Sequence, residues 1–189
     1  MHQDLERILF REDEIRAGIE RLAQEITRCY AGRPLTVVAV LKGSILFTAD
    51  LVRRLPLPLE MAFVSASSYG QGTAPAELRV SLLPSDGEIC GRDVLLVDDI
   101  LDTGRTLARL VAELRGRGAR DVRTCVFLDK PARRSVDLRP DWRCFEVEDA
   151  FVVGYGLDLA GRYRNLPFVA ALRPEVLELA ARGEPWTTT

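Results

Sequence analysis

The hydrophobic positions of this chain form two patterns, and each pattern predicts one kind of secondary structure. Between residues 11 and 30, Ile15, Ile19, Leu22 and Ile26 recur every three or four positions among charged residues, which predicts an amphipathic helix. Shorter stretches are mostly apolar, as strands are when both faces of a sheet are covered. Such stretches predict strands at residues 35–41, 59–65, 94–97, 122–128, 151–153 and 168–172.

Helical patterns follow three of these strands, at residues 45–54, 105–117 and 175–181. The order strand, loop, helix is the first half of a βαβ unit, which builds parallel sheets flanked by helices. Residues 66–76 are rich in small and turn-forming residues, so we expect a mobile loop there, followed by a hairpin through residues 78–83. The sequence therefore predicts an α/β fold with a twisted, mainly parallel sheet, and a frayed tail at residues 184–189.

Length and composition limit the organisation and the class of function. The chain has 189 residues, 47% of them hydrophobic, so we expect one sizeable core and a single domain over residues 1–189. Its 26 Lys and Arg against 28 Asp and Glu give a net charge of -2, which indicates no nucleic-acid or membrane partner. The four cysteines form no CxxC pair and the first residues carry no apolar signal core, so a reduced, cytoplasmic protein is expected.

Three aspartates follow the predicted strand at residues 94–97, where ligands of α/β sheets gather. Asp98 and Asp99 are adjacent, and Asp102 comes three residues later. Two adjacent carboxylates repel each other at the edge of a sheet, and capping a helix needs only one of them. Vicinal ribose hydroxyls, with a magnesium ion nearby, would use both.

The segment Asp102-Thr103-Gly104-Arg105-Thr106 opens the helix predicted at residues 105–117. Free backbone N–H groups and two hydroxyl groups can surround a phosphate there, and Gly104 lets the backbone approach it closely. The chain has no GxxxxGK[ST] loop and no GxGxxG after a strand, which excludes two other phosphate-binding motifs. The alternative is that Asp102 or Thr103 only caps the helix.

The string VLLVDDILDTGRTL at residues 94–107 resembles the phosphoribosyl-pyrophosphate-binding motif of the type I phosphoribosyltransferases. In that family the acidic pair binds the ribose hydroxyls and the turn holds the 5-phosphate. The resemblance assigns the first role to Asp98 and Asp99 and the second to residues 102–106. The family more often has Glu at the first acidic position, so a shorter carboxylate stands here.

Three further segments resemble the hypoxanthine-guanine branch of this family: LKGS at residues 41–44, SYG at residues 68–70, and LDKP through FVVGYGLD to RYRNLP at residues 128–167. In that branch the LKG turn has a non-proline cis peptide and touches pyrophosphate, which implies this role for Lys42 and Gly43. Ser68 and Tyr69 resemble the start of a catalytic lid, although an idle surface loop is an equal alternative without the motif.

The same resemblance implies a purine site. Lys130 would donate to the purine O6, and Phe151 would stack on the base. The backbone of Val152 and Asp158 would line the edge of the base. Taken alone, Lys130 could belong to a solvated basic turn, and a Phe in an FVV strand is more often part of a core.

On the donor side, the resemblance assigns Asp158, Asp98 and Asp99 to Mg²⁺, and Arg134 and Arg164 to the pyrophosphate. Each arginine taken alone could be a solvated charge. The fold implied is that of the type I phosphoribosyltransferases, with a small hood over the site built from the terminal regions and about residues 140–189. A homodimer or homotetramer is expected.

The function implied is transfer of a 5-phosphoribosyl group from phosphoribosyl pyrophosphate to hypoxanthine or guanine, with Asp102 taking the proton from purine N7. One alternative is an RNA-binding regulator of the pyrimidine-operon attenuator type, whose loop can read VDDVLYTGRT. A tyrosine at position 102 could not act as the base, and the net charge argues against RNA binding. Lys130 with FVVGYGLD argues against adenine and orotate, while a xanthine preference stays open.

Overall fold

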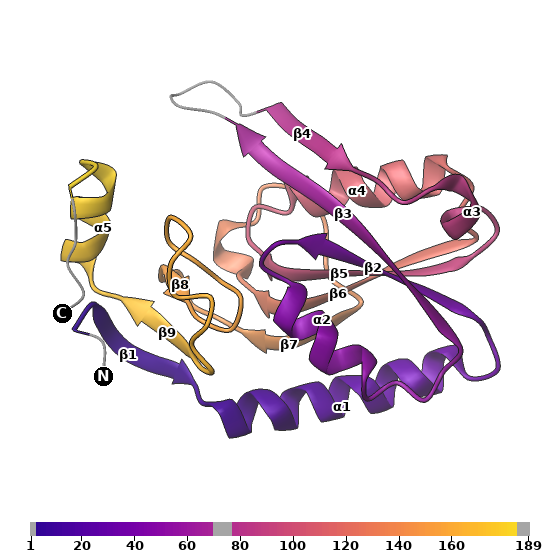
Figure 1. Ribbon diagram of the computed structural model, residues 1–189, viewed down its shortest axis with the longest axis horizontal. Coiled ribbons are helices and arrows are strands. Elements are labelled where there is room, and N and C mark those ends of the chain that lie inside the picture. Colours follow the sequence, from indigo (N-terminus) through magenta and orange to yellow (C-terminus); the bar gives the residue numbers. More distant parts are fainter. Residues whose placement is uncertain (1–2, 70–76, 185–189) are drawn as a thin grey trace.

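The protein is described by a computed structural model that covers residues 3–69 and 77–184 (Figure 1). The elements follow one another along the chain as β1 (Leu5–Phe10), α1 (Glu12–Tyr30), β2 (Leu35–Leu41), α2 (Ile45–Val52), β3 (Leu59–Tyr69), β4 (Glu77–Leu82), α3 (Asp86–Ile89), β5 (Asp93–Leu101), α4 (Arg105–Gly116), β6 (Asp121–Asp129), β7 (Trp142–Glu146), β8 (Val152–Val153), β9 (Val169–Leu172) and α5 (Pro174–Ala181). None of the described helices is long and apolar enough to cross a membrane.

The main sheet has six strands in the order β4-β3-β2-β5-β6-β7, and only β4 runs antiparallel to its neighbour. Its central strand β5 is covered on both faces. Leu95 and Val97 pack with α1 and α2, whereas Val94 and Leu96 pack with α4. Figure 1 shows α1 and α4 on opposite sides of the sheet. The α/β class with a mainly parallel sheet, expected from the sequence, is confirmed.

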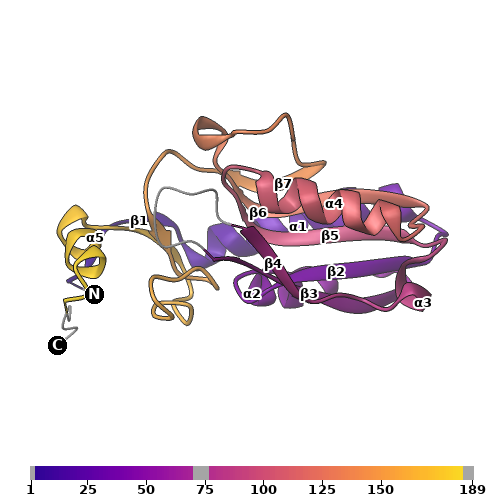
Figure 2. The ribbon, with the colours of Figure 1, turned by 90° about the horizontal axis from the view of Figure 1, so that it is seen from above.

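A second sheet, in the order β1-β9-β8, is antiparallel and small. We call this sheet, α5 and residues 154–168 the hood. Figures 1 and 2 show the hood set beside the main sheet, at the end toward which its parallel strands run. The Tyr155 hydroxyl donates to Asp50 of α2 at 2.6 Å, and the Tyr163 hydroxyl donates to Asp4 at 2.9 Å. These bonds join the hood loop to α2 and to the segment before β1.

Four features differ from the sequence-based expectations. The strand expected to end at residue 65 continues to Tyr69 because its backbone pairs with β4, so residues 66–69 are not part of a loop. The rest of the expected loop, residues 70–76, lies outside the described part of the chain. The same is true of residues 185–189 in the expected frayed tail. Strand β5 extends to Leu101, so the acidic pair lies in a strand. Strands β1 and β7 were not expected.

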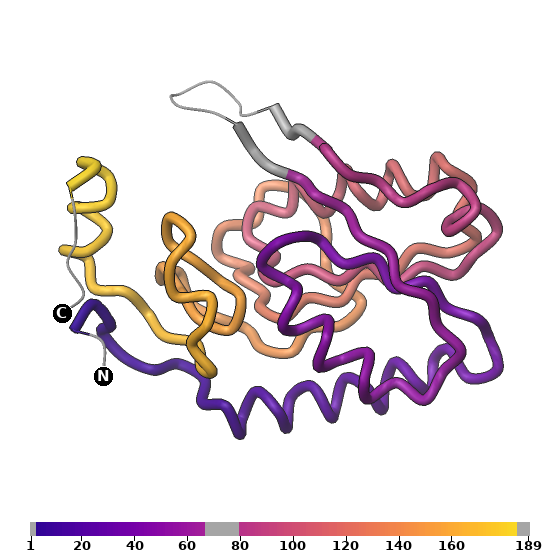
Figure 3. Tube along the Cα trace, in the orientation of Figure 1, coloured from indigo at the N-terminus to yellow at the C-terminus, as the bar shows by residue number. Residues whose placement is uncertain are grey.

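Strand β7 corrects the expected extent of the hood. Residues 142–146 pair in parallel with β6 and form the last strand of the main sheet. The hood therefore begins after them and not at about residue 140. The tube in Figure 3 shows the chain leaving the main sheet at this point and continuing into the hood.

Candidate active site

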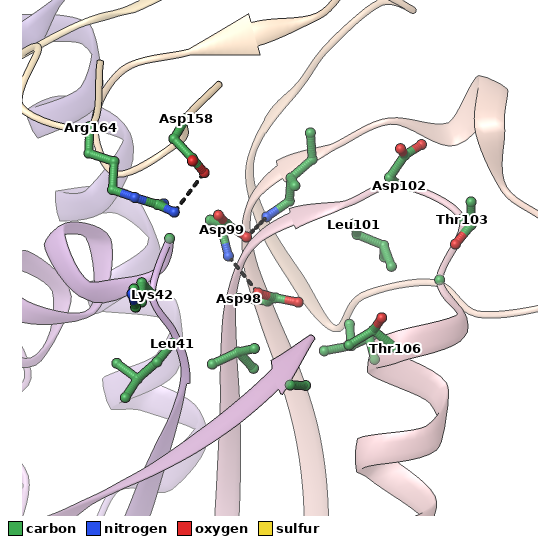
Figure 4. Close-up of a pocket in the computed structure, with 16 residues that line it drawn as sticks. Leu41, Lys42, Asp98, Asp99, Leu101, Asp102, Thr103, Thr106, Asp158 and Arg164 are labelled. Atoms are coloured by element: carbon green, nitrogen blue, oxygen red, sulfur yellow. Dashed lines mark hydrogen bonds and ion pairs between the residues drawn. The ribbon is translucent and has the colours of Figure 1, made fainter. Parts of the chain in front are cut away.

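A cavity of about 290 Å³ opens where β2 and β5 end (Figure 4). Most of the donor-site residues predicted from the sequence line it, namely Lys42, Gly43, Asp98, Asp99, Asp102, Thr103, Gly104, Thr106, Asp158 and Arg164. They come from the turn after β2, the end of β5, the turn before α4 and the hood. Figure 4 shows Lys42, Asp158 and Arg164 on one side of the acidic pair, and Asp102, Thr103 and Thr106 on the other.

The acidic pair lies near the C-terminal end of β5, where Asp98 is buried and Asp99 is half-buried. The Asp98 carboxylate is buried and accepts the N–H of Asp99 at 3.0 Å. The Asp99 carboxylate accepts the N–H of Ile100 at 2.9 Å. Burial, together with the charge of Asp99, raises the pKa of Asp98 well above its ordinary value. Burial also raises the pKa of Asp99, although hydrogen bonds to its carboxylate and, less strongly, the positive charge of Arg164 oppose this. The pair therefore favours ligands that donate hydrogen bonds to it or bring a cation.

The turn after β2 has the backbone that the resemblance implies. The peptide bond between Leu41 and Lys42 is cis, and Lys42 is exposed at the cavity. The buried Ser44 hydroxyl donates to the carbonyl of Val40 at 2.6 Å and fastens the turn to the end of β2.

Gly43 in this turn fits between the acidic pair and the hood. A Cβ atom on Gly43 would lie 1.6 Å from Oδ2 of Asp99. A Cβ atom on Gly156 of the hood would lie 2.1 Å from the carbonyl oxygen of Gly43, and the φ of Gly156 is +99°. Both positions therefore require glycine for close approach.

The turn before α4 has the features of an anion site. Gly104 has a φ of 83°, and α4 begins at the next residue, where the first N–H groups have no partner within the helix. The side chains of Thr103 and Thr106 line the cavity beside these groups. Arg105 does not line it, since its Nε donates to the Ser135 hydroxyl at 3.2 Å.

Asp102 stands at the edge of this turn. Its Oδ1 is buried and has no hydrogen-bond partner in the described part of the chain. The nearest cation is Arg133, whose Nε lies 3.7 Å from that oxygen. A buried carboxylate oxygen without a hydrogen-bond partner at a cavity wall can accept a hydrogen bond from a ligand.

Comparison with known proteins decides the family. The sequence pattern of the family described as "Phosphoribosyl transferase domain" matches residues 8–159. The hypoxanthine-guanine phosphoribosyltransferase of Bacillus subtilis (strain 168) is 42% identical over 178 residues, which cover 94% of this chain and 99% of that protein. This chain belongs to the phosphoribosyltransferase family, in its hypoxanthine-guanine branch.

Two further comparisons show how far the similarity extends. The "Bifunctional protein TilS/HprT" of Listeria monocytogenes serotype 4b is 45% identical over 176 residues; the match covers 93% of this chain but 27% of that protein. This chain thus spans about a quarter of the length of that relative. The structure of Trypanosoma cruzi hypoxanthine phosphoribosyl transferase superposes with a TM-score of 0.89 and 38% identity, covering 96% of this chain and 98% of that one.

In this phosphoribosyltransferase, three of the residues predicted to bind the purine, Lys130, Phe151 and Val152, lie outside the cavity lining, whereas Asp158 lines it. Lys130 is only 4% exposed, and its Nζ donates to the carbonyl of Ala150 at 2.7 Å, with Asp149 at 3.8 Å. Phe151 is 41% exposed and directly follows Ala150, while Val152 is buried in β8. Lys130 and Phe151 thus lie close together, but the structure does not join them to the donor cavity.

The hood brings an ion pair to the cavity. Arg164 bonds to the Asp158 carboxylate at 2.7 Å and donates to the carbonyl of Gly156, and Asp158 also accepts the N–H of Gly161 at 2.7 Å. Asp158 is therefore held in place from two sides. The Arg164 guanidinium carries the positive charge that faces the acidic pair.

Two other predicted groups are placed differently from the cavity residues. Arg134, predicted to bind pyrophosphate, does not line the cavity. Its guanidinium lies behind the turn before α4 and donates to backbone carbonyls and to the carboxylate of Asp129. The backbones of Ser68 and Tyr69 pair with β4 at the end of β3. The remainder of the lid predicted there lies outside the described residues.

Sequence reasoning missed several residues that shape this site. Gly156 stands within the quoted FVVGYGLD motif, and Ser135 follows the quoted LDKP segment by only a few residues. Asp129 ends the buried strand β6, so a charge at the end of an apolar run was the available signal. Its partners cannot be read from the local sequence.

The acidic pair generates a test of stability. Asp98→Asn should raise the free energy of unfolding at neutral pH by about 1 kcal/mol, because it removes a buried charge beside Asp99. Since the folded-state pKa of Asp98 is raised, stability falls as the pH rises above its unfolded value of about 3.9, so the gain should shrink toward pH 4. Urea unfolding at several pH values measures both effects.

Asp93→Asn is the matched control, because Asp93 is also buried but is bonded by Arg120, which lowers its pKa. A lowered folded-state pKa contributes stability above the unfolded value, and this stability is lost as the pH falls through the folded-state value. Asp93→Asn should therefore destabilise the protein at neutral pH. An Asp98→Asn protein that is also less stable at pH 7 would contradict our interpretation of the pair.

Proposed function

We propose that this phosphoribosyltransferase joins hypoxanthine or guanine to the ribose 5-phosphate of phosphoribosyl pyrophosphate, releasing pyrophosphate and forming IMP or GMP. The observation that carries the proposal is the order of groups across the cavity (Figure 4). The acidic pair lies between the turn before α4 and the side that holds Lys42 and Arg164. A molecule with vicinal hydroxyls between two anionic groups fits this order, and the names of the relatives support the base.

The chain's own residues would hold the donor in three places. Asp98 and Asp99 accept hydrogen bonds from the ribose hydroxyls. This is favourable because, in the described part of the chain, the two carboxylates accept from backbone N–H groups and from no hydroxyl group. The backbone N–H groups and hydroxyls of residues 103–106 hold the 5-phosphate. Lys42 and Arg164 offset the charge of the pyrophosphate as it leaves.

The acid groups suit Mg²⁺ that arrives with the donor. Among the described residues no group of three or more His, Cys, Asp or Glu side chains is arranged to hold a metal. Mg²⁺ is commonly bound by one or two carboxylates together with substrate phosphates and water. Asp98, Asp99 and Asp158 would supply the carboxylates, and the ion would neutralise charge on the pyrophosphate.

Asp102 is the group that would take the proton from purine N7. Its Oδ1 is buried without a hydrogen-bond partner, so the protein holds an acceptor at the cavity wall that is not already occupied. Closure of the site against water would protect the ribosyl cation, and the start of the predicted lid, Ser68 and Tyr69, lies at the end of β3.

Lys130 and Phe151 would receive the base. A buried ammonium group can donate a hydrogen bond to the O6 acceptor of a 6-oxopurine. The amino group of adenine is itself a donor and would leave the ammonium group unpaired. The bond from Lys130 to Ala150 uses one of its three N–H donors and fixes the direction of the side chain, leaving donors for a ligand. The relatives give no support to the RNA-binding regulator or to a xanthine preference.

We also propose that the protein is a cytoplasmic homodimer or homotetramer. Met61 and Phe63 are exposed on the face of β3 opposite to Ala62 and Val64, which are buried under α4. The exposed Ile45 and Leu46 begin α2. Association would bury these side chains, and sedimentation equilibrium measures it. The four cysteines are free, which suits a reducing compartment.

The experiment that tests the function is an assay of nucleotide formation. Purified protein with phosphoribosyl pyrophosphate should form IMP from hypoxanthine or GMP from guanine, only when Mg²⁺ is present. Adenine should give little product and xanthine less than the other 6-oxopurines. Absence of turnover with every 6-oxopurine would overturn the proposal.

Asp102→Asn should lower kcat by roughly 10²-fold, the usual scale for loss of a general base, and leave the affinity for phosphoribosyl pyrophosphate within a few fold. The amide has nearly the same shape but cannot accept the proton. Initial rates at saturating donor, with donor affinity from isothermal titration, measure the two effects. An unchanged kcat would return Asp102 to a capping role.

Lys130→Ala should lower kcat/KM for hypoxanthine and guanine. The loss of transition-state stabilisation should be roughly 1.5–3 kcal/mol, the range for a hydrogen bond from a charged group. The preference over adenine should narrow, because the group that favours O6 is gone. Competition assays with the three bases measure this. An equal change for all three bases would show that Lys130 supports the hood without selecting the base.

A further inference from the structure

We propose that Arg134, together with Ser135, is a positioning device for the 5-phosphate turn and does not touch the pyrophosphate. The proposal rests on the proposed function, because it assumes that the turn before α4 holds the 5-phosphate. It differs from the role that the family resemblance implied for Arg134. The observations that carry it are the hydrogen bonds of three consecutive carbonyl groups.

The carbonyls of Leu101, Asp102 and Thr103 all accept hydrogen bonds from residues 134 and 135. Arg134 donates from Nη2 to Leu101 at 3.2 Å and from Nε to Asp102 at 3.0 Å. Ser135 donates to the Thr103 carbonyl twice, from its N–H at 3.0 Å and from its hydroxyl at 3.2 Å. The backbone before α4 is thus fastened from behind, residue by residue.

This fastening determines where the N–H groups of the turn point. In a trans peptide the C=O and the following N–H point in opposite directions. Because the three carbonyls point toward residues 134 and 135, the N–H groups of residues 102, 103 and 104 point away from them. A phosphate is bound by such a row of N–H groups and is repelled by carbonyl oxygens.

The shape of the turn agrees with this direction. A Cβ atom on Gly104 would lie 2.7 Å from Cγ2 of Val136 and 3.0 Å from Cδ of Arg134. The glycine is therefore needed where the turn packs on the 134–136 segment, as well as for its positive φ. Arg134 stabilises the turn by contact with its backbone and not through the cavity.

Arg134 is itself held tightly. Its side chain is 14% exposed, and besides the two carbonyls of the turn it donates to the carbonyl of Leu138 and to the carboxylate of Asp129. Four of its five N–H donors are therefore in use. Asp129 is buried and also accepts a bond from Arg143 at 3.1 Å. An arginine bound in this way has no free fork for pyrophosphate.

The two roles of Arg134 predict different losses of affinity. A positioning residue for the 5-phosphate turn affects every ligand that carries a 5-phosphate, including the nucleotide product. A pyrophosphate ligand affects the donor and free pyrophosphate but not the nucleotide. Titration of GMP and of inorganic pyrophosphate, each with Mg²⁺, therefore separates the roles.

Arg134→Lys keeps the charge but cannot span the two carbonyls of Leu101 and Asp102. We expect it to weaken GMP binding by about tenfold or more and to change pyrophosphate binding less than about twofold. Ser135→Ala removes the hydroxyl bond to the Thr103 carbonyl and the bond from Arg105 to that hydroxyl but keeps the backbone bond to Thr103, so it should weaken GMP binding by about threefold with the same selectivity. This second variant keeps the test open if Arg134→Lys does not fold.

Arg143→Lys is the matched control, because it changes the other arginine on Asp129. In the described part of the chain Arg143 bonds to Asp129 and Glu146, so the variant should lower thermal stability without changing the affinity for GMP selectively. Equal losses of GMP and pyrophosphate in Arg134→Lys would overturn the proposal in favour of direct contact. A lower unfolding temperature with unchanged GMP affinity in both test variants would also overturn the proposal. It would show that residues 134 and 135 stabilise the fold without affecting phosphate binding. A wild-type protein that binds neither ligand and forms no nucleotide would instead refute the proposed function.

Discussion

The position of two adjacent carboxylates, one buried and one half-buried, at the end of β5 is the constraint on which the surrounding structure depends. Such a pair is unfavourable without a ligand, because burial and mutual repulsion both raise the pKa values of its members. The chain maintains it by close backbone approach. The Asp99 carboxylate packs against Gly43, and the carbonyl of Gly43 packs against Gly156 of the hood. A continuous line of contact without intervening side chains therefore runs from the central strand to the hood.

Two arginines lie near the end of β5, and their hydrogen bonds give them different roles. Arg164 reaches the cavity from the hood and is oriented by Asp158, so its charge is available to a ligand. Arg134 lies behind the turn before α4, and its N–H groups donate to carbonyl groups of that turn. It therefore acts on the ligand only through the backbone. Proximity in the sequence to a binding motif therefore does not distinguish a residue that binds a ligand from one that shapes the loop.

Local patterns in the sequence were sufficient for the central strands of the main sheet and for most of the donor site. Strands β2, β5 and β6 are apolar on both faces, and the acidic pair and the turn at residues 102–106 follow β5 directly, so spacing alone brings them together. Strands β1 and β7 were missed because they are short and carry charges on an exposed side. The extension of β3 and the bonds of Arg134 depend on partners elsewhere in the chain, and no local pattern reports those.

The antiparallel pairing of β1 with β9 sets an order on assembly during synthesis. Leu5 pairs with Leu172, so β1 leaves the ribosome long before the strand that it pairs with. The parallel strands β2, β3, β5 and β6 can pair earlier, since each emerges before residue 130. A nascent chain would thus form the turns after β2 and β5 that line the cavity before the hood is complete, and β1 would stay unpaired and open to chaperones during that interval.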